Sequence, residues 1–174
     1  TTENFAKGKI ATHNTKIDYQ KRYDDYYSQF EKDSNGNIKT HKTRAGKEEA
    51  TLKKGARKRF DANRPSGSKE RGTDMDHTVS AGEIMRDPQA NAHLSREEQE
   101  KFANSKKNLN EMDSSLNRSK GDTSMEDWLN NPNSKGQKPR DVHNLSEEDE
   151  KKLRKKDKEA REEYDRVKAE GERR

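Results

Sequence analysis

Two short segments about thirty residues apart carry residue types suited to hydrolysis of phosphodiesters. In the first, DMDHTV, the carboxylate Asp76 directly precedes the imidazole His77. In the second, NLNEMDSSLNRSKGD, Asn108 lies nine positions before Asn117. A neutral imidazole can accept a proton from water near neutral pH, and carboxylate and amide oxygens bind hard divalent cations. The two segments together therefore favour a metal-dependent nuclease site.

The combined pattern resembles the HNH endonuclease family, also called ββα-metal or His-Me finger nucleases, in the variant that ends on Asn (HNN type). In that family one strand carries the Asp-His pair, and a second strand leads into a helix that closes a metal site. The resemblance implies strands at 73–79 and 109–113. It also implies a helix at 114–120, with Gly121 at its C-terminal cap.

The resemblance also implies a role for each motif residue. His77 corresponds to the general base, and Asp76 to a metal ligand beside it. Asn117 corresponds to the second metal ligand, and Asn108 to the residue that orients the catalytic histidine and braces the loop. Two oxygen-donating ligands suit one Mg²⁺ or Mn²⁺ ion better than Zn²⁺.

Cationic side chains near the motif are candidates for contacts with the nucleic-acid backbone. Arg118 and Lys120 follow Asn117 by one and three positions. Further upstream, residues 46–60 are predicted to form a basic helix. Its candidate contacts are Lys53, Lys54, Arg57, Lys58 and Arg59.

Charge is unevenly distributed along the chain. Residues 1–72 carry a net +8, residues 73–130 carry −5, and residues 131–174 carry +2. An acidic pocket attracts divalent cations but repels phosphates, so a basic flank would supply the attraction to nucleic acid. The alternative is that the lysine-rich flank serves solubility alone.

Composition limits the size of the core. Charged residues make up 42% of the chain and hydrophobic residues 23%, and Leu, Ile, Val and Phe together number 18 of 174. That share is below the level of about one fifth at which disorder becomes the expectation. We therefore expect an α+β fold in which a small ββα-metal hairpin-helix unit is flanked by charged helices and flexible segments.

Several classes of site are excluded by composition. The chain has no cysteine, so disulfides, thiol catalysis and cysteine-ligated zinc are ruled out. No apolar run or charged leader predicts a membrane span or signal peptide. The chain begins with Thr1 rather than Met, as a fragment would. We expect a cytoplasmic location, in a bacterial cell or phage-infected host.

The sequence divides into three predicted regions. Residues 1–72 form a basic helical arm, residues 73–130 the HNH-like nuclease domain, and residues 131–174 a linker with a charged C-terminal helix. Within the arm, aromatic residues in 16–32 recur at helical spacing, which favours a packing face over base stacking. The break at 64–68 marks the boundary before the nuclease-like domain.

Three local features outside the motif are also predicted. The insert at 78–107, longer than the usual family loop, contains a helix after Ser95 with Glu98 in a capping box. Met125, Trp128 and Leu129 are expected to fold back as a short helix that anchors the core. A highly charged helix begins after the N-cap Ser146, and its thin apolar stripe predicts a solvated single helix.

These expectations point to a metal-dependent DNA endonuclease that leaves a 3′-hydroxyl and a 5′-phosphate, as the family does. RNA is an open alternative substrate, because the motif acts on the phosphate. The main rival is a non-catalytic nucleic-acid-binding or virion-associated structural protein that retains the HNH-like fold. A largely disordered charged scaffold is the third reading. Target sequence, nicking against double-strand cleavage, and oligomeric state do not follow from the sequence.

Overall fold

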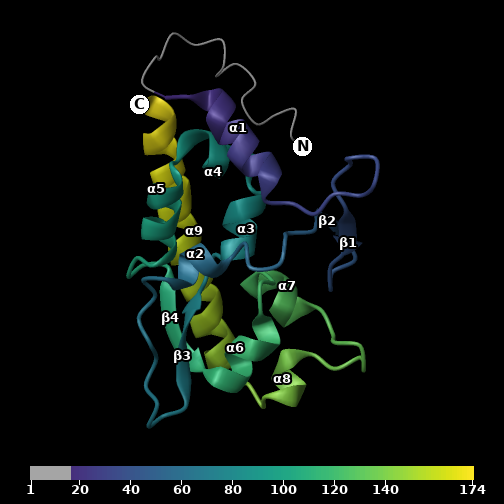
Figure 1. The fold of residues 1–174 in the computed structure, drawn as a ribbon. Coiled ribbons are helices and arrows are strands. Elements are labelled where there is room, and N and C mark those ends of the chain that lie inside the picture. The colour runs from purple at the N-terminus through teal and green to yellow at the C-terminus, as the bar shows by residue number, and fades with distance from the viewer. Residues whose placement is uncertain (1–16) are drawn as a thin grey trace.

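Helices and two short antiparallel hairpins make up residues 17–174, the part of the chain that this computed structural model describes (Figure 1). This architecture agrees with the predicted α+β class at the coarse level. In chain order the elements are α1 (Tyr19–Ser28), β1 (Thr40–Lys42), β2 (Glu48–Ala50), α2 (Lys58–Asp61), β3 (Thr73–His77), α3 (Ala81–Arg86), α4 (Pro88–His93), α5 (Arg96–Ala103), β4 (Leu109–Asp113), α6 (Ser114–Lys120), α7 (Met125–Asn130), α8 (Pro139–Val142) and α9 (Glu147–Arg173).

Strands β3 and β4 form an antiparallel hairpin, and α6 follows β4 directly and contacts both strands. In the register, His77 lies opposite Leu109. The bounds of β4 and α6 coincide with the predicted ranges. Strand β3 ends two residues before the predicted limit at Val79, because the Val79 amide donates to the Asn108 side chain instead of to a strand (2.8 Å). Gly121 ends α6 at a φ of +54°, a conformation that glycine adopts without strain.

The aromatic stripe of the arm is a packing face. Tyr19 and Tyr26 in α1, and Phe30 just after it, are all buried. Asp18 caps the helix by accepting from the Lys21 amide (2.9 Å). Residues 1–16 of the predicted arm lie outside the described residues.

The predicted helix at 46–60 is wrong. Residues 48–50 form β2, which pairs with β1, and only Lys58–Asp61 is helical. Two glycines account for the difference. Gly46 and Gly55 both have a φ of +80°, so each sits in a turn conformation that interrupts a helix.

One hydrophobic core joins the arm, the insert and the C-terminal helix. The insert is helical, with α3, α4 and α5, and the predicted capping box of Ser95 and Glu98 is present at the start of α5. A chain with so few apolar residues gains more burial from one shared core than from several small ones. The core includes Phe30, Leu52, Phe60, Val79, Ile84, Met85, Leu94, Phe102, Ala160 and Tyr164.

The prediction that α7 folds back as an anchor is confirmed. Met125, Trp128 and Leu129 are buried and form a second, smaller apolar cluster. The indole Nε1 of Trp128 donates to Ser119 Oγ at 2.9 Å, so the helix of the hairpin unit and α7 are tied together. Burial of the whole ring agrees with a packing role.

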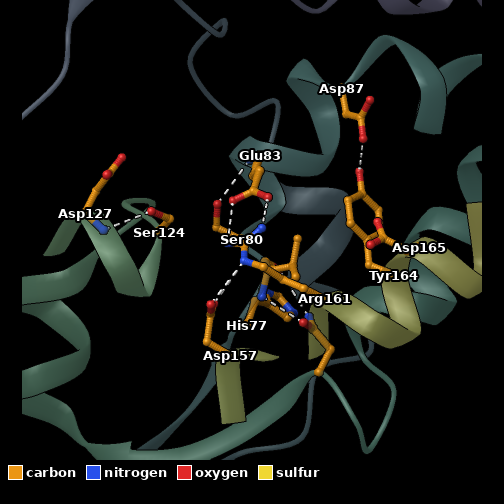
Figure 2. A network of polar contacts seen from close by, with 12 residues as sticks. His77, Ser80, Glu83, Asp87, Ser124, Asp127, Asp157, Arg161, Tyr164 and Asp165 are labelled. Carbon is orange, nitrogen blue, oxygen red and sulfur yellow. Dashed lines mark hydrogen bonds and ion pairs between the residues drawn. The ribbon is translucent and has the colours of Figure 1, made fainter. Parts of the chain in front are cut away.

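The prediction of a solvated C-terminal helix is wrong, although its N-cap at Ser146 is confirmed. Helix α9 packs against α4 and α7 (Figure 1). Figure 2 shows Arg161 of α9 between Glu83 and Asp157; its guanidinium donates to both carboxylates, at 3.0 and 3.1 Å. The Tyr164 hydroxyl donates to Asp87 at 2.6 Å. These polar contacts help to hold α9 against the rest of the fold, because few apolar residues lie on its packing face.

Within the described part of the chain, none of the helices has the length and apolar character needed to cross a membrane.

Candidate active site

Three of the four predicted motif residues line one cleft of about 220 Å³: Asp76 and His77 at the end of β3, and Asn117 in α6. Antiparallel pairing brings the end of β3 next to the start of β4, and α6 crosses back over the hairpin. The remaining lining residues are Arg57, Asp61, Arg64, Ser80, Ala81, Gly121 and Asp122.

The His77 imidazole is held by a residue that the motif does not contain. Its Nε2 lies 2.7 Å from Oδ1 of Asn104. The orientation of the Asn104 amide is fixed, because its Nδ2 donates to the carbonyl oxygen of Phe60 at 3.1 Å. Since Oδ1 can only accept, Nε2 must carry the proton, and Nδ1 is left as the basic nitrogen.

Burial lowers the pKa of His77 below its ordinary value, and the nearby Arg64 and Lys120 charges lower it further, while the bond to Asn104 opposes the shift. The imidazole is therefore neutral at pH 7. A neutral ring with one nitrogen tethered and the other free has the protonation state that a general base needs.

Asn108 lies beneath the cleft rather than in it. Its side chain is fully buried, where Oδ1 accepts from the Val79 amide (2.8 Å) and Nδ2 donates to the carbonyl oxygens of Val79 and Ala103 (3.2 and 2.9 Å). Asn108 thus braces the segment that follows His77. Asn108 was also expected to orient the catalytic histidine, but the direct contact with the imidazole is made by Asn104 instead.

The sequence-based expectation that Lys120 contacts the nucleic-acid backbone is wrong, because this side chain points into the protein. Its side chain is 0% exposed, and its Nζ lies 3.3 Å from Oδ2 of Asp76 and 3.4 Å from the His77 carbonyl oxygen. The Asp76–Lys120 contact is an ion pair without hydrogen-bond geometry. Burial raises the pKa of Asp76, and the Lys120 charge opposes that rise.

Asp76 and Asn117 offer the oxygen donors that Mg²⁺ and Mn²⁺ prefer. Asn117 Nδ2 donates to Asp74 Oδ2 at 3.1 Å, which fixes the amide and directs Oδ1 away from that contact. No group of three His, Cys, Asp or Glu side chains able to hold a metal occurs among the described residues. A carboxylate with an amide nonetheless fits Mg²⁺, which commonly takes one or two protein ligands and completes its shell with water and phosphate.

The predicted cationic contacts separate into three groups. Arg57 lines the cleft. Arg59 points inward, where its guanidinium donates to Glu100, Gln29 and Gln99, so it supports the fold and does not face nucleic acid. The others are exposed and lie outside the cleft lining: Lys53, Lys54, Lys58 and Arg118.

Sequence reasoning missed four residues of the site region: Asn104, Arg64, Asp61 and Asp122. Asn104 was hidden in the insert as the C-cap of α5. Arg64 was assigned to the chain break at 64–68, and Asp61 lies between that break and the predicted basic helix; the two form an ion pair at 3.0 Å. Asp122 directly follows Gly121 in the motif segment, and that proximity was the one available signal.

Comparisons of the chain with protein-family models, with curated proteins and with solved structures found no match.

Proposed function

We propose that this protein is a metal-dependent endonuclease that hydrolyses DNA phosphodiester bonds with His77 as general base. The proposal rests chiefly on one observation: Asp76, His77 and Asn117 line a single cleft, with the His77 ring tethered through Nε2. The arrangement of β3, β4 and α6 supports placing the site in an HNH-type ββα-metal unit, because the resemblance implies the same order of elements around the same residues.

His77 would act on the water that attacks the phosphorus. Nδ1 takes one proton as the water oxygen bonds to phosphorus, and the bond from phosphorus to the 3′ oxygen breaks. The departing oxygen takes a proton from solvent, which leaves a 3′-hydroxyl and a 5′-phosphate. Asn104 keeps the ring oriented through this step, so the base needs no reorientation.

Asp76 and Asn117 would hold one Mg²⁺ or Mn²⁺ ion. Such an ion neutralises charge that develops on the phosphate and on the leaving oxygen. Asn108 contributes indirectly, by bracing the backbone from Val79 onward. Arg57 and Arg64 line the same cleft and are the cations best situated to contact the phosphate backbone.

A second candidate function is a non-catalytic nucleic-acid-binding or virion-associated protein. One observation favours it: the buried ammonium of Lys120 already neutralises Asp76. A carboxylate engaged by a lysine has less affinity for a metal ion, because the two cations compete for one charge. Metal binding therefore separates the two functions.

The test is cleavage of supercoiled DNA, and of a matched RNA, by the purified protein with Mg²⁺ or Mn²⁺ and with EDTA. The nuclease predicts metal-dependent cuts with 3′-hydroxyl and 5′-phosphate ends. If the protein cleaves the RNA at least as fast as the DNA, then the proposed substrate is RNA instead of DNA alone. Binding of nucleic acid without cleavage under any metal, together with no calorimetric signal for Mn²⁺, would favour the non-catalytic function.

A further inference from the structure

The cations of the cleft are each engaged by a carboxylate of the same cleft. Arg57 forms an ion pair with Asp122, and Arg64 forms one with Asp61. All four residues line the cleft that contains Asp76 and His77. We propose that Asp122 and Asp61 act as internal phosphate substitutes, which hold Arg57 and Arg64 until a nucleic-acid phosphate displaces them.

The charge of the cleft explains why such an exchange is needed. Two arginines face three carboxylates, counting Asp76, and the buried Lys120 beside Asp76 brings the net charge around the cleft to zero, with no surplus of positive charge. A phosphodiester entering this cleft meets no free arginine. It must take a guanidinium from a carboxylate, and phosphate can replace carboxylate because both accept the paired N–H groups of arginine.

Asp122 is placed to act on Arg57 in particular. Its backbone carbonyl accepts from the Ser80 hydroxyl at 3.0 Å, which fixes the segment just after α6. Its carboxylate also lies where a Cβ on Gly82 would contact it at 3.1 Å, so Gly82 leaves room for it. Both side chains of the Arg57–Asp122 pair are 38% exposed, while the paired Nε of Arg57 is itself buried, so a phosphate would approach the exposed part of the Arg57 side chain.

The partner of this device is the backbone of a nucleic acid, so the inference rests on the proposed function for its ligand. It does not require catalysis. The arrangement would weaken the binding of any polyanion in the cleft, because each contact there with Arg57 or Arg64 must first break an ion pair. It would also make affinity depend on Asp122 and Asp61, residues that repel phosphate themselves.

A double-mutant cycle separates release of Arg57 from simple removal of a negative charge. The variants are Asp122→Asn, Arg57→Gln and the double variant, and the measurement is the dissociation constant for a short fluorescent DNA duplex in EDTA. Asp122→Asn should tighten binding about two- to fivefold, the range expected for an exposed ion pair. In the Arg57→Gln background the same change should have little effect. Arg57→Gln alone should reduce the salt dependence of log K by about one.

Two controls accompany the cycle. Asp165→Asn makes the same charge change at an exposed position of α9, where it should leave affinity unchanged. Asp61→Asn with Arg64→Gln gives a second cycle, in side chains 51% and 33% exposed, in case Arg57→Gln does not fold.

Equal tightening by Asp122→Asn with and without Arg57 would overturn the inference, as would no tightening or the absence of DNA binding by every variant. Because the assay measures binding in EDTA, its outcome is independent of cleavage. A protein that cuts DNA but fails the cycle refutes only the exchange, and one that passes the cycle without cutting refutes only the nuclease.

Discussion

The imidazole Nε2 of His77 lies 2.7 Å from the amide Oδ1 of Asn104, 27 positions further along the chain. The same amide donates to the carbonyl oxygen of Phe60 in α2. A residue of the insert thus links the candidate base to the N-terminal arm. The insert helps to orient the base, in addition to its role in packing.

Replacing Asn104 should impair catalysis more than binding. Asn104→Ala removes the acceptor for Nε2, so the ring loses its orientation and Nδ1 loses its fixed place. Loss of such a supporting contact typically costs about 10- to 100-fold. We expect that reduction in kcat with little change in KM. An equal loss from Asn35→Ala, which removes an exposed amide in a turn of the arm, or a change confined to KM, would contradict the orienting role.

In the metal-free protein, the pKa of His77 should be lower than that of an ordinary histidine. Because burial lowers the pKa of His77, the folded state binds its proton less readily than the unfolded chain does. Stability should therefore be fully present above the unfolded pKa of about 6.5 and decline as pH falls through the folded value. An NMR titration of the imidazole checks the direction. His77→Gln should flatten the decline in the free energy of unfolding, and a pKa above 6.5 would contradict the assignment.

Lys120 should matter for stability. Lys120→Met leaves the Asp76 carboxylate buried without its partner, and removal of one member of a buried ion pair costs about 3–5 kcal/mol. Chemical denaturation at pH 7 measures this loss. Arg118→Met, on the exposed face of the same helix, should change the free energy of unfolding by less than about 0.5 kcal/mol. Asp76→Asn should recover part of the Lys120→Met loss, and an additive loss would contradict the pairing.

Replacing Gly171 by alanine should destabilise the protein, although alanine is usually preferred to glycine in helices. Gly171→Ala normally stabilises a helix by about 1 kcal/mol. Here the added Cβ would lie 2.5 Å from the His93 carbonyl oxygen, a backbone atom that cannot move aside freely. We therefore expect a lower midpoint in thermal unfolding. A higher midpoint would show that α9 does not approach α4 so closely.

The parts of the fold that local signals determine could be predicted from the sequence. The capping box at Ser95, the N-cap at Ser146, the strand β4 and the helix α6 all follow from caps, alternation and the Gly121 stop. Helix α9 was misjudged because its apolar stripe is thin, and because the ion pair that docks it, between Arg161 and Glu83, joins residues 78 positions apart.

The candidate site was predictable only where the motif carried it. Asp76, His77 and Asn117 are close together in space as expected. At two positions the structure differs from the sequence-based expectation, and each difference has a physical reason. Lys120 is at the end of a short helix, and its side chain turns inward to form an ion pair with the buried carboxylate of Asp76, which is 44 positions away in the sequence. Asn104 carries no local signal, because it reaches His77 only through tertiary contacts, across 27 positions of the sequence.

The most direct test of the central claim is the single-turnover rate of DNA cleavage with Mn²⁺ by wild type, His77→Ala and His41→Ala. His41 is an exposed histidine in β1 that bonds to Glu49, so its loss controls for removal of an imidazole. We expect that His77→Ala loses about a hundredfold or more in rate while DNA affinity is kept, and that His41→Ala cuts at the wild-type rate. Cleavage by His77→Ala at the wild-type rate would contradict the role of His77 as general base.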